Sequence, residues 1–97
     1  MQVISTAIPD VKIIRPQKHG DHRGFLSETF SRRELAAPLG DIDFVQDNHS
    51  MSVKPGTVRG LHFQKPPYAQ AKLIRVLKGA IWDIAVDLRK DSATFGK

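Results

Sequence analysis

The chain has 97 residues, a formal net charge of +5 and no cysteine. A chain of this length forms one domain at most, with a small core. The lack of cysteine excludes disulfides and thiolate chemistry and favours a reducing, cytoplasmic location. No signal-peptide pattern is present at the start, and no stretch approaches the ~20 apolar residues that span a bilayer. We therefore expect no membrane association.

The positive charge raises the possibility of nucleic-acid binding, but its distribution argues against this function. Basic residues are scattered singly or in pairs, such as Arg32–Arg33 and Arg89–Lys90, usually with acidic residues nearby. No surface of interleaved aromatic and basic residues is apparent for stacking bases. A few cations around an anionic small molecule would give the same balance. We expect no nucleic-acid partner.

Apolar residues alternate with a period of two along most of the chain, which is typical of β-strands. Strands are expected at 11–15, 24–30, 44–53, 58–64, 73–77 and 81–88. Turn signals separate them at 18–21, 54–56, 65–67 and 78–79. Many short strands with regular turns predict an all-β, antiparallel sandwich or barrel.

One short helix is expected among the strands. Ser31 is a suitable N-cap, and Glu34 follows at the spacing of a capping box, before the apolar residues 35–37. Pro38 and Gly40 are expected to end the helix within a few turns.

The densest group of chemically capable residues is 58–64. His62 lies between apolar neighbours in an expected strand, close to Arg59, and its pKa near neutrality suits a general base. The alternative is a hydrogen-bonded core histidine without a catalytic role, and the pattern alone favours that alternative.

Lys72 begins a strand in which it shares a face with Ile74 and Val76. If that face is interior, Lys72 needs an anionic partner, because burying an unpaired ammonium group is costly. If it is not, the side chain extends into solvent. Asp83 lies on the polar face of 81–88, where it could orient His62, pair with Lys72 or simply be solvated.

A metal-binding cupin site is not supported by the sequence. Such a site would need a His-x-His pair with a nearby glutamate, whereas Gln64 occupies the second position and Lys65 follows. No glycine-rich nucleotide loop is present either. We expect no metal site.

Five blocks in register resemble the dTDP-4-dehydrorhamnose 3,5-epimerase family. They are 21–25 with Glu28, 46–50, 56–64, 69–73, and the stretch with Gly79, Asp83 and 86–89. The resemblance implies a jelly-roll (cupin-like) barrel, incomplete in this chain, with residues 1–97 as the N-terminal part of a single epimerase domain. An antiparallel barrel made only of the expected strands would leave long exposed edges.

The resemblance also implies an enzyme of dTDP-L-rhamnose biosynthesis that needs no cofactor. The family substrate is a dTDP sugar whose C4 ketone acidifies the hydrogens on C3 and C5, so that epimerisation proceeds through an enolate. His62 would be the base, and Lys72 would stabilise the enolate oxygen. The implied substrate-binding residues are Arg23, Phe25, Glu28, Gln46, Asn48 and Arg59, with Asp83 in support.

Strand parity agrees with part of this assignment. Gln46 and Asn48 share one face, whereas Arg59 and His62 have opposite parity. We therefore expect Gly60 to hold a bulge or twist that re-aims one of them.

The resemblance leaves two members of the family site unmatched. The family's tyrosine acid has no counterpart here, because Tyr68 is the only tyrosine and its position does not match. The family's aspartate that pairs with the histidine has no counterpart in these residues either. We therefore expect little or no activity from this stretch alone. The alternatives are a single-site epimerase acting at C3 or C5, and a non-catalytic sugar-nucleotide-binding or assembly module. The implied partner is a second copy, joined by exchange of N-terminal strands.

Overall fold

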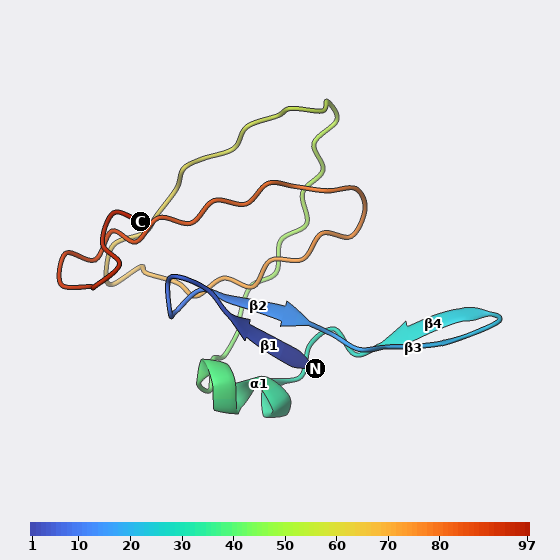
Figure 1. The fold of residues 1–97 in the computed structure, drawn as a ribbon. Helices are drawn as coiled ribbons and strands as arrows, with labels where there is room; N and C mark the ends of the chain where they lie inside the picture. The colour runs from blue at the N-terminus through green and yellow to red at the C-terminus, as the bar shows by residue number, and fades with distance from the viewer.

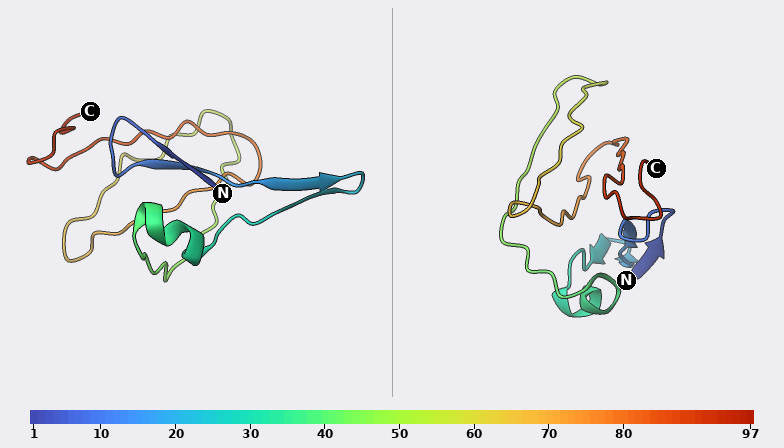
Figure 2. Two further views of the ribbon diagram at one scale, coloured as in Figure 1. Left: turned by 60° about the horizontal axis from the view of Figure 1, so that its bottom comes forward. Right: turned by 90° about the vertical axis from the view of Figure 1, so that its left-hand side faces the viewer.

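The computed structural model describes all residues from 1 to 97. Its regular elements are β1 (Gln2–Ser5), β2 (Lys12–Arg15), β3 (Lys18–Asp21), β4 (Gly24–Ser27) and α1 (Arg32–Leu39). β1 pairs with β2 and β3 with β4, so the strands form two separate antiparallel sheets. The β3–β4 hairpin projects away from the rest of the chain, and the residues after α1 run through long open loops (Figures 1 and 2).

The first hairpin confirms the strand expected at 11–15 and adds a partner that periodicity does not predict. Gln2 pairs with Arg15 and Ser5 with Lys12. The connection is tightened by Thr6, whose hydroxyl donates to the carbonyl of Val11 at 2.7 Å. β1 is too short, with two adjacent apolar residues between polar ones, to give a clear alternation.

The turn expected at 18–21 is wrong, because these residues form β3. The chain reverses direction just after β3, at residues 22–23, between the paired residues Asp21 and Gly24. The Asp21 carboxylate accepts a hydrogen bond from the Arg23 N–H at 2.8 Å, and Gly24 has a φ of +136°, which side-chain-bearing residues rarely adopt. The strand expected at 24–30 is confirmed only over β4.

The helix begins as expected and ends slightly differently. The Ser31 hydroxyl accepts from the Glu34 N–H at 3.2 Å, which is one half of a capping box. Pro38 lies inside the last turn instead of ending the helix, and Gly40, at a φ of +83°, is the C-cap. Because Pro38 has no N–H to donate to the Glu34 carbonyl, the last turn lacks one helical hydrogen bond. No helix of the structure is long and apolar enough to cross a membrane.

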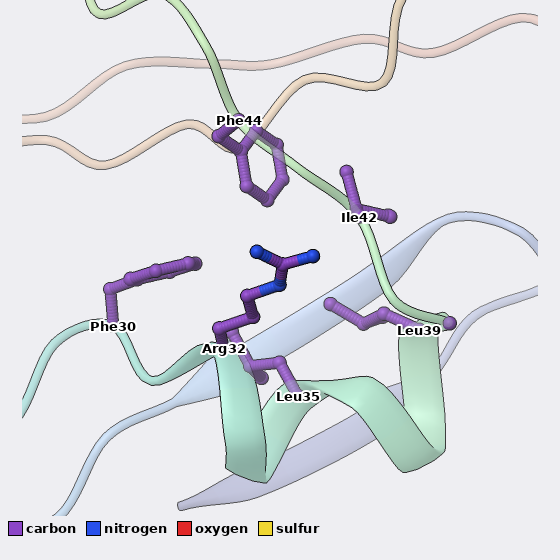
Figure 3. Close-up of a pocket in the computed structure, with 7 residues that line it drawn as sticks. Phe30, Arg32, Leu35, Leu39, Ile42 and Phe44 are labelled. Carbon is purple, nitrogen blue, oxygen red and sulfur yellow. The ribbon is translucent and has the colours of Figure 1, made fainter.

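A small apolar cluster forms around α1. Leu35 is the one buried apolar residue of the chain, at 4% exposure. The rings of Phe30 and Phe44 meet edge to face at a centroid distance of 5.8 Å, and the side chain of Arg32 extends between the helix and these rings (Figure 3). The hollow that they line has a volume of about 10 Å³, far below the roughly 300 Å³ typical of ligand sites. We interpret it as a satellite core.

The strands expected between residues 44 and 88 are not formed. The turns expected among them are present at Pro55–Gly56 and Pro66–Pro67, with a bend at 77–79. The segments between these turns carry no ladder, and the chain has 20 backbone–backbone hydrogen bonds, against roughly 65 expected for a folded chain of this length. Alternation favours an extended segment, but a strand also requires a neighbour with matching donors and acceptors.

The chain thus forms two small antiparallel sheets, one short helix and extended segments without ladders, and these elements do not by themselves close the expected barrel. The accessible surface is 9228 Å², whereas a compact monomer of this mass exposes about 5,500 Å². The radius of gyration is 15.7 Å, against about 12.5 Å for a compact domain. Two residues, Leu35 and Asp87, are buried. The chain therefore has no continuous core.

Candidate functional site

The β3–β4 hairpin displays three of the predicted substrate-binding residues. Arg23 is held at the turn by an ion pair with Asp21, with Nη2 and Oδ2 2.7 Å apart. This bond raises the pKa of Arg23 and lowers that of Asp21. Phe25 is exposed, with the Lys18 ammonium 4.5 Å from its ring centre. Glu28, just after β4, is exposed. The hairpin thus offers a guanidinium group and an aromatic ring to solvent.

A second group lies on the loop that carries the turn at Pro55–Gly56. The Gln46 side-chain amide donates to the Asn48 side-chain oxygen at 3.4 Å, so these side chains share a face. Arg59, on the other arm of the loop, donates from Nε to the Ser52 hydroxyl at 3.2 Å. The structure therefore brings Arg59 against the arm that bears Gln46 and Asn48.

His62 lies next to a glycine whose conformation interrupts the extended chain. Gly60 has a φ of +105°, and a Cβ added there would lie 3.2 Å from His62 Nδ1. Only a glycine lets the imidazole ring lie this close to the main chain without displacement. Gly60 thus interrupts the extended chain through its positive φ, and the bulge or twist expected to re-aim Arg59 or His62 stays a prediction, because no ladder forms here.

Lys72, Asp83 and His62 form no side-chain hydrogen bond or ion pair with one another. All three residues are exposed, and the ion pairs of the chain involve other side chains. The hollows beside α1 and beside Asp10 and Arg89 are lined by none of the predicted site residues. No group of three or more potential metal ligands gathers in the structure. The proposed base, cation and supporting acid are therefore displayed on open chain.

Sequence reasoning missed a polar network centred on Asp87. Alternation places Asp87 on the same polar face of 81–88 as Asp83, whereas its side chain is 2% exposed. The carboxylate accepts from Arg89 Nε at 2.9 Å and from the hydroxyls of Ser92 and Thr94 at 2.6 Å each. The signal available in the sequence was an aspartate followed by an arginine two residues on and two hydroxyl residues in the next loop.

The same network joins the two ends of the chain. Arg89 also forms an ion pair with Asp10, in the connection between β1 and β2, and the C-terminal loop lies beside that connection in both figures (Figures 1 and 2). The loop closes through main-chain bonds, since the Gly96 N–H donates to the Asp87 carbonyl at 2.7 Å. Arg89, then Ser92 and Thr94, hold the pKa of the Asp87 carboxyl far below its usual range.

Replacing Asp87 with asparagine is expected to open this loop. A carboxylate with a lowered pKa stabilises the fold above the pKa of the unfolded carboxyl, about 3.9, and loses that contribution as the pH falls further. Amide hydrogen exchange of the 97-residue chain should show at least several-fold weaker protection at Gly96 in D87N at pH 7. The wild-type protection should decline towards the D87N value below about pH 4.

The matched control for this substitution is Asp83→Asn on the same segment. Asp83 is exposed and forms no ion pair, so D83N should leave the protection of Gly96 unchanged. Equal protection in D87N and the wild-type chain would show that the Asp87 network does not hold the loop.

Comparison with known proteins assigns the family. A family model for isomerases of dTDP sugars matches residues 5–97. The chain belongs to this family, which is described as dTDP-4-dehydrorhamnose 3,5-epimerase.

Individual relatives are similar over essentially the whole chain. The dTDP-4-dehydrorhamnose 3,5-epimerase of Shigella flexneri is 53% identical over 98 residues, covering 100% of this chain and 54% of that protein. A dTDP-4-dehydrorhamnose 3-epimerase from Streptomyces niveus is 36% identical, covering 99% of this chain and 46% of the relative. The chain thus spans about half the length of the curated relatives it matches.

A solved structure shows that the open loops follow a defined path. The crystal structure of dTDP-4-dehydrorhamnose 3,5-epimerase from Bacillus anthracis, with TDP and PPi bound, matches at a TM-score of 0.94 and 51% identity. The match covers 99% of this chain and 55% of that chain. The extended segments therefore take the course of a folded relative, although here they lack ladders.

Proposed function

We propose that this chain carries the base and much of the substrate-binding set of a dTDP-4-dehydrorhamnose 3,5-epimerase that acts on dTDP-4-keto-6-deoxyglucose. The observation that carries the proposal is the match to a TDP-bound 3,5-epimerase at 51% identity with a TM-score of 0.94. The double epimerase is preferred to a single-site enzyme because the 3-epimerase relative is less similar, at 36% identity. In this proposal the chain is the N-terminal part of one jelly-roll domain.

The proposed reaction is a proton transfer next to a ketone. His62 removes the proton from C3 or C5 of the sugar, and the electron pair moves onto the C4 oxygen to form an enolate. Lys72 donates a hydrogen bond to this oxygen where its negative charge develops. A proton returned to the opposite face of the carbon gives the epimer and restores the ketone. Asp83 supports the site by orienting His62 or pairing with Lys72.

The binding roles follow from side-chain chemistry. Arg23 and Arg59 carry planar guanidinium groups that suit diphosphate oxygens, and the ring of Phe25 offers a flat face to a base or sugar. Gln46 and Asn48 supply neighbouring amides for the sugar hydroxyls. Glu28 is assigned to the nucleoside base, contributed from a neighbouring subunit.

A homodimer through the N-terminal strands is part of the proposal. Its support is the β3–β4 hairpin, which projects from the rest of the chain (Figure 1) and exposes the side chains of Phe25 and Leu26. Such an apolar projection is suited to a second copy that receives it. The sedimentation coefficient of the assembled enzyme measures whether it is a dimer. We place the reaction in the cytoplasm, in keeping with the absence of cysteine.

Deuterium uptake by the substrate tests the proposed reaction. The protein is residues 1–97 fused to the part of the Shigella flexneri relative that lies outside the match, and is named the fused enzyme below. In D2O, dTDP-4-keto-6-deoxyglucose should gain deuterium at both C3 and C5, measured by NMR. The 97-residue chain alone should give little or no epimerised product, because it lacks the acid that protonates the opposite face.

The sugar carbons that take up deuterium distinguish the candidate functions. Uptake at C3 alone, or at C5 alone, would identify a single-site epimerase. Binding of dTDP without any exchange by the fused enzyme would contradict the catalytic proposal and favour a binding module.

A further inference from the structure

The two arms of the loop at Pro55–Gly56 meet through a pair of side chains. The turn between the arms is closed by Thr57, whose hydroxyl donates to the Lys54 carbonyl at 2.7 Å. This reversal brings Ser52, on the first arm, within hydrogen-bond distance of Arg59 on the second. The contact between the arms is therefore made by a hydroxyl and a guanidinium group.

Ser52 and its neighbour in the chain hold one edge of the Arg59 guanidinium group. Nε donates to the Ser52 hydroxyl at 3.2 Å, and Nη2 donates to the Met51 carbonyl at 3.5 Å. These two nitrogens form the side edge of the planar group, and Nη1 donates to no group of the chain. The end edge, made of Nη1 and the second hydrogen of Nη2, is thus free to donate two parallel hydrogen bonds to an anion.

The bond to Ser52 also determines the side of the loop on which the guanidinium group lies. Residues 46, 48 and 52 share one face of the extended first arm, because alternate side chains of an extended chain point the same way. The bond between the Gln46 and Asn48 side chains is consistent with this arrangement. Bonding to Ser52 therefore draws the guanidinium group towards the face that carries the two proposed sugar-binding amides.

The other proposed diphosphate-binding arginine is held by the same edge. Arg23 donates from Nε and Nη2 to the Asp21 carboxylate, at 3.2 and 2.7 Å, and its Nη1 is also free of partners in the chain. The two arginines differ in the charge of their partners. A carboxylate offsets the charge of Arg23, whereas a hydroxyl and a carbonyl leave the charge of Arg59 uncompensated. Arg59 is therefore the stronger anion site of the two, and a neutral group sets its orientation.

We infer that Ser52 is a positioning residue for binding of the sugar-nucleotide diphosphate: its hydroxyl holds Arg59 Nε and thereby turns the end edge of the guanidinium group to the phosphate oxygens. The inference rests on the binding role of Arg59 in the proposed function. An arginine side chain that is not held loses its rotamer freedom when it binds an anion. A side chain that is already held at Nε loses less of it, so the affinity is higher.

Binding of dTDP to the fused enzyme, measured by isothermal titration calorimetry, tests the inference. Ser52→Ala should weaken the affinity about three- to tenfold, the range of one hydrogen bond. Ser52→Thr keeps the hydroxyl and should restore most of the affinity. The diphosphate is charged in the substrate and in the transition state alike, so S52A should raise KM for dTDP-4-keto-6-deoxyglucose by the same factor and leave kcat unchanged. General damage to the enzyme would lower kcat as well.

A double-mutant cycle with Arg59→Ala separates positioning from direct contact with the ligand. R59A should weaken dTDP binding more than S52A does, and adding S52A to R59A should cause no further loss. Ser50→Ala is the matched control, because Ser50 is exposed and lies on the same face but does not bond to Arg59. The effect of S50A on the affinity should be the same with and without Arg59.

The outcomes distinguish this inference from the proposed reaction. Unchanged dTDP affinity in S52A, or an equal loss from S52A in the R59A enzyme, would overturn the positioning role. An R59A enzyme that binds dTDP as tightly as the unsubstituted one would overturn it together with the binding role of Arg59. The titrations involve no turnover, so coupling between Ser52 and Arg59 without deuterium exchange would leave the inference standing and count against catalysis.

Discussion

Replacing His62 with alanine in the fused enzyme is expected to slow deuterium uptake at C3 and C5 by about 10²–10⁴-fold, the usual contribution of a general base. The imidazole ring lies against Gly60, where an added Cβ would come within 3.2 Å of Nδ1. Alanine removes the proton acceptor while leaving the positive φ of Gly60 undisturbed. The rate is measured by NMR at saturating dTDP-4-keto-6-deoxyglucose, so that the chemical step is compared and not substrate binding.

His49→Ala is the matched control for His62→Ala. His49 is also exposed. In an extended chain successive side chains point to opposite faces, so the His49 side chain faces away from those of Gln46 and Asn48. We expect H49A to exchange at the wild-type rate, and both variants to bind dTDP with unchanged affinity. An H62A enzyme with wild-type exchange would place the base at another residue.

The elements that the sequence predicted well are those decided by neighbours in the chain. The start of α1 follows from Ser31 and Glu34, whose bond involves residues three apart. The end of β4 was placed too far along, because alternation continues to Phe30 although the ladder to β3 stops at Ser27. Local patterns thus located these elements, while pairing decided their extent.

The elements that were missed depend on pairing between segments, which the pattern within one segment does not report. β3 was expected as a turn because Gly20 and Asp21 are typical turn residues, but their pairing with Phe25 and Gly24 makes them a strand. The extended segments after residue 43 have the right alternation and lack a partner to form ladders. Alternation reports which side chains share a face, and it contains no information on what lies beside that face.

In the candidate site, too, the features set by near neighbours in the chain were predictable, and those set by contacts between segments were not. The shared face of Gln46 and Asn48 was predictable from parity and is consistent with the bond between them. The contact of Arg59 with Ser52 required the loop to fold back on itself, and the burial of Asp87 required a hydroxyl-rich loop and an arginine to close over it. The roles of His62 and Lys72 came from the family resemblance, because the structure places both on open chain.

Replacing Lys72 with alanine in the fused enzyme is expected to lower the rate of deuterium uptake by about 10²–10³-fold, the loss seen when one donor to a developing oxyanion is removed. The substrate ketone is neutral before proton abstraction and its oxygen becomes negative afterwards. A cation at this oxygen therefore stabilises the transition state more than the bound substrate, and the loss should fall on kcat with little change in KM. Lys78→Ala, in the bend at 77–79, is the control and should exchange normally.

Lys72→Arg separates the charge of Lys72 from its shape. A guanidinium group keeps the positive charge but presents a planar fork in place of a compact ammonium group, so K72R should recover part of the rate lost in K72A. The competing role is binding of the diphosphate, which is negative in the ground state and the transition state alike. In that case K72A would raise KM and the dissociation constant for dTDP while kcat stayed near the wild-type value. This result would move Lys72 from the enolate to the nucleotide.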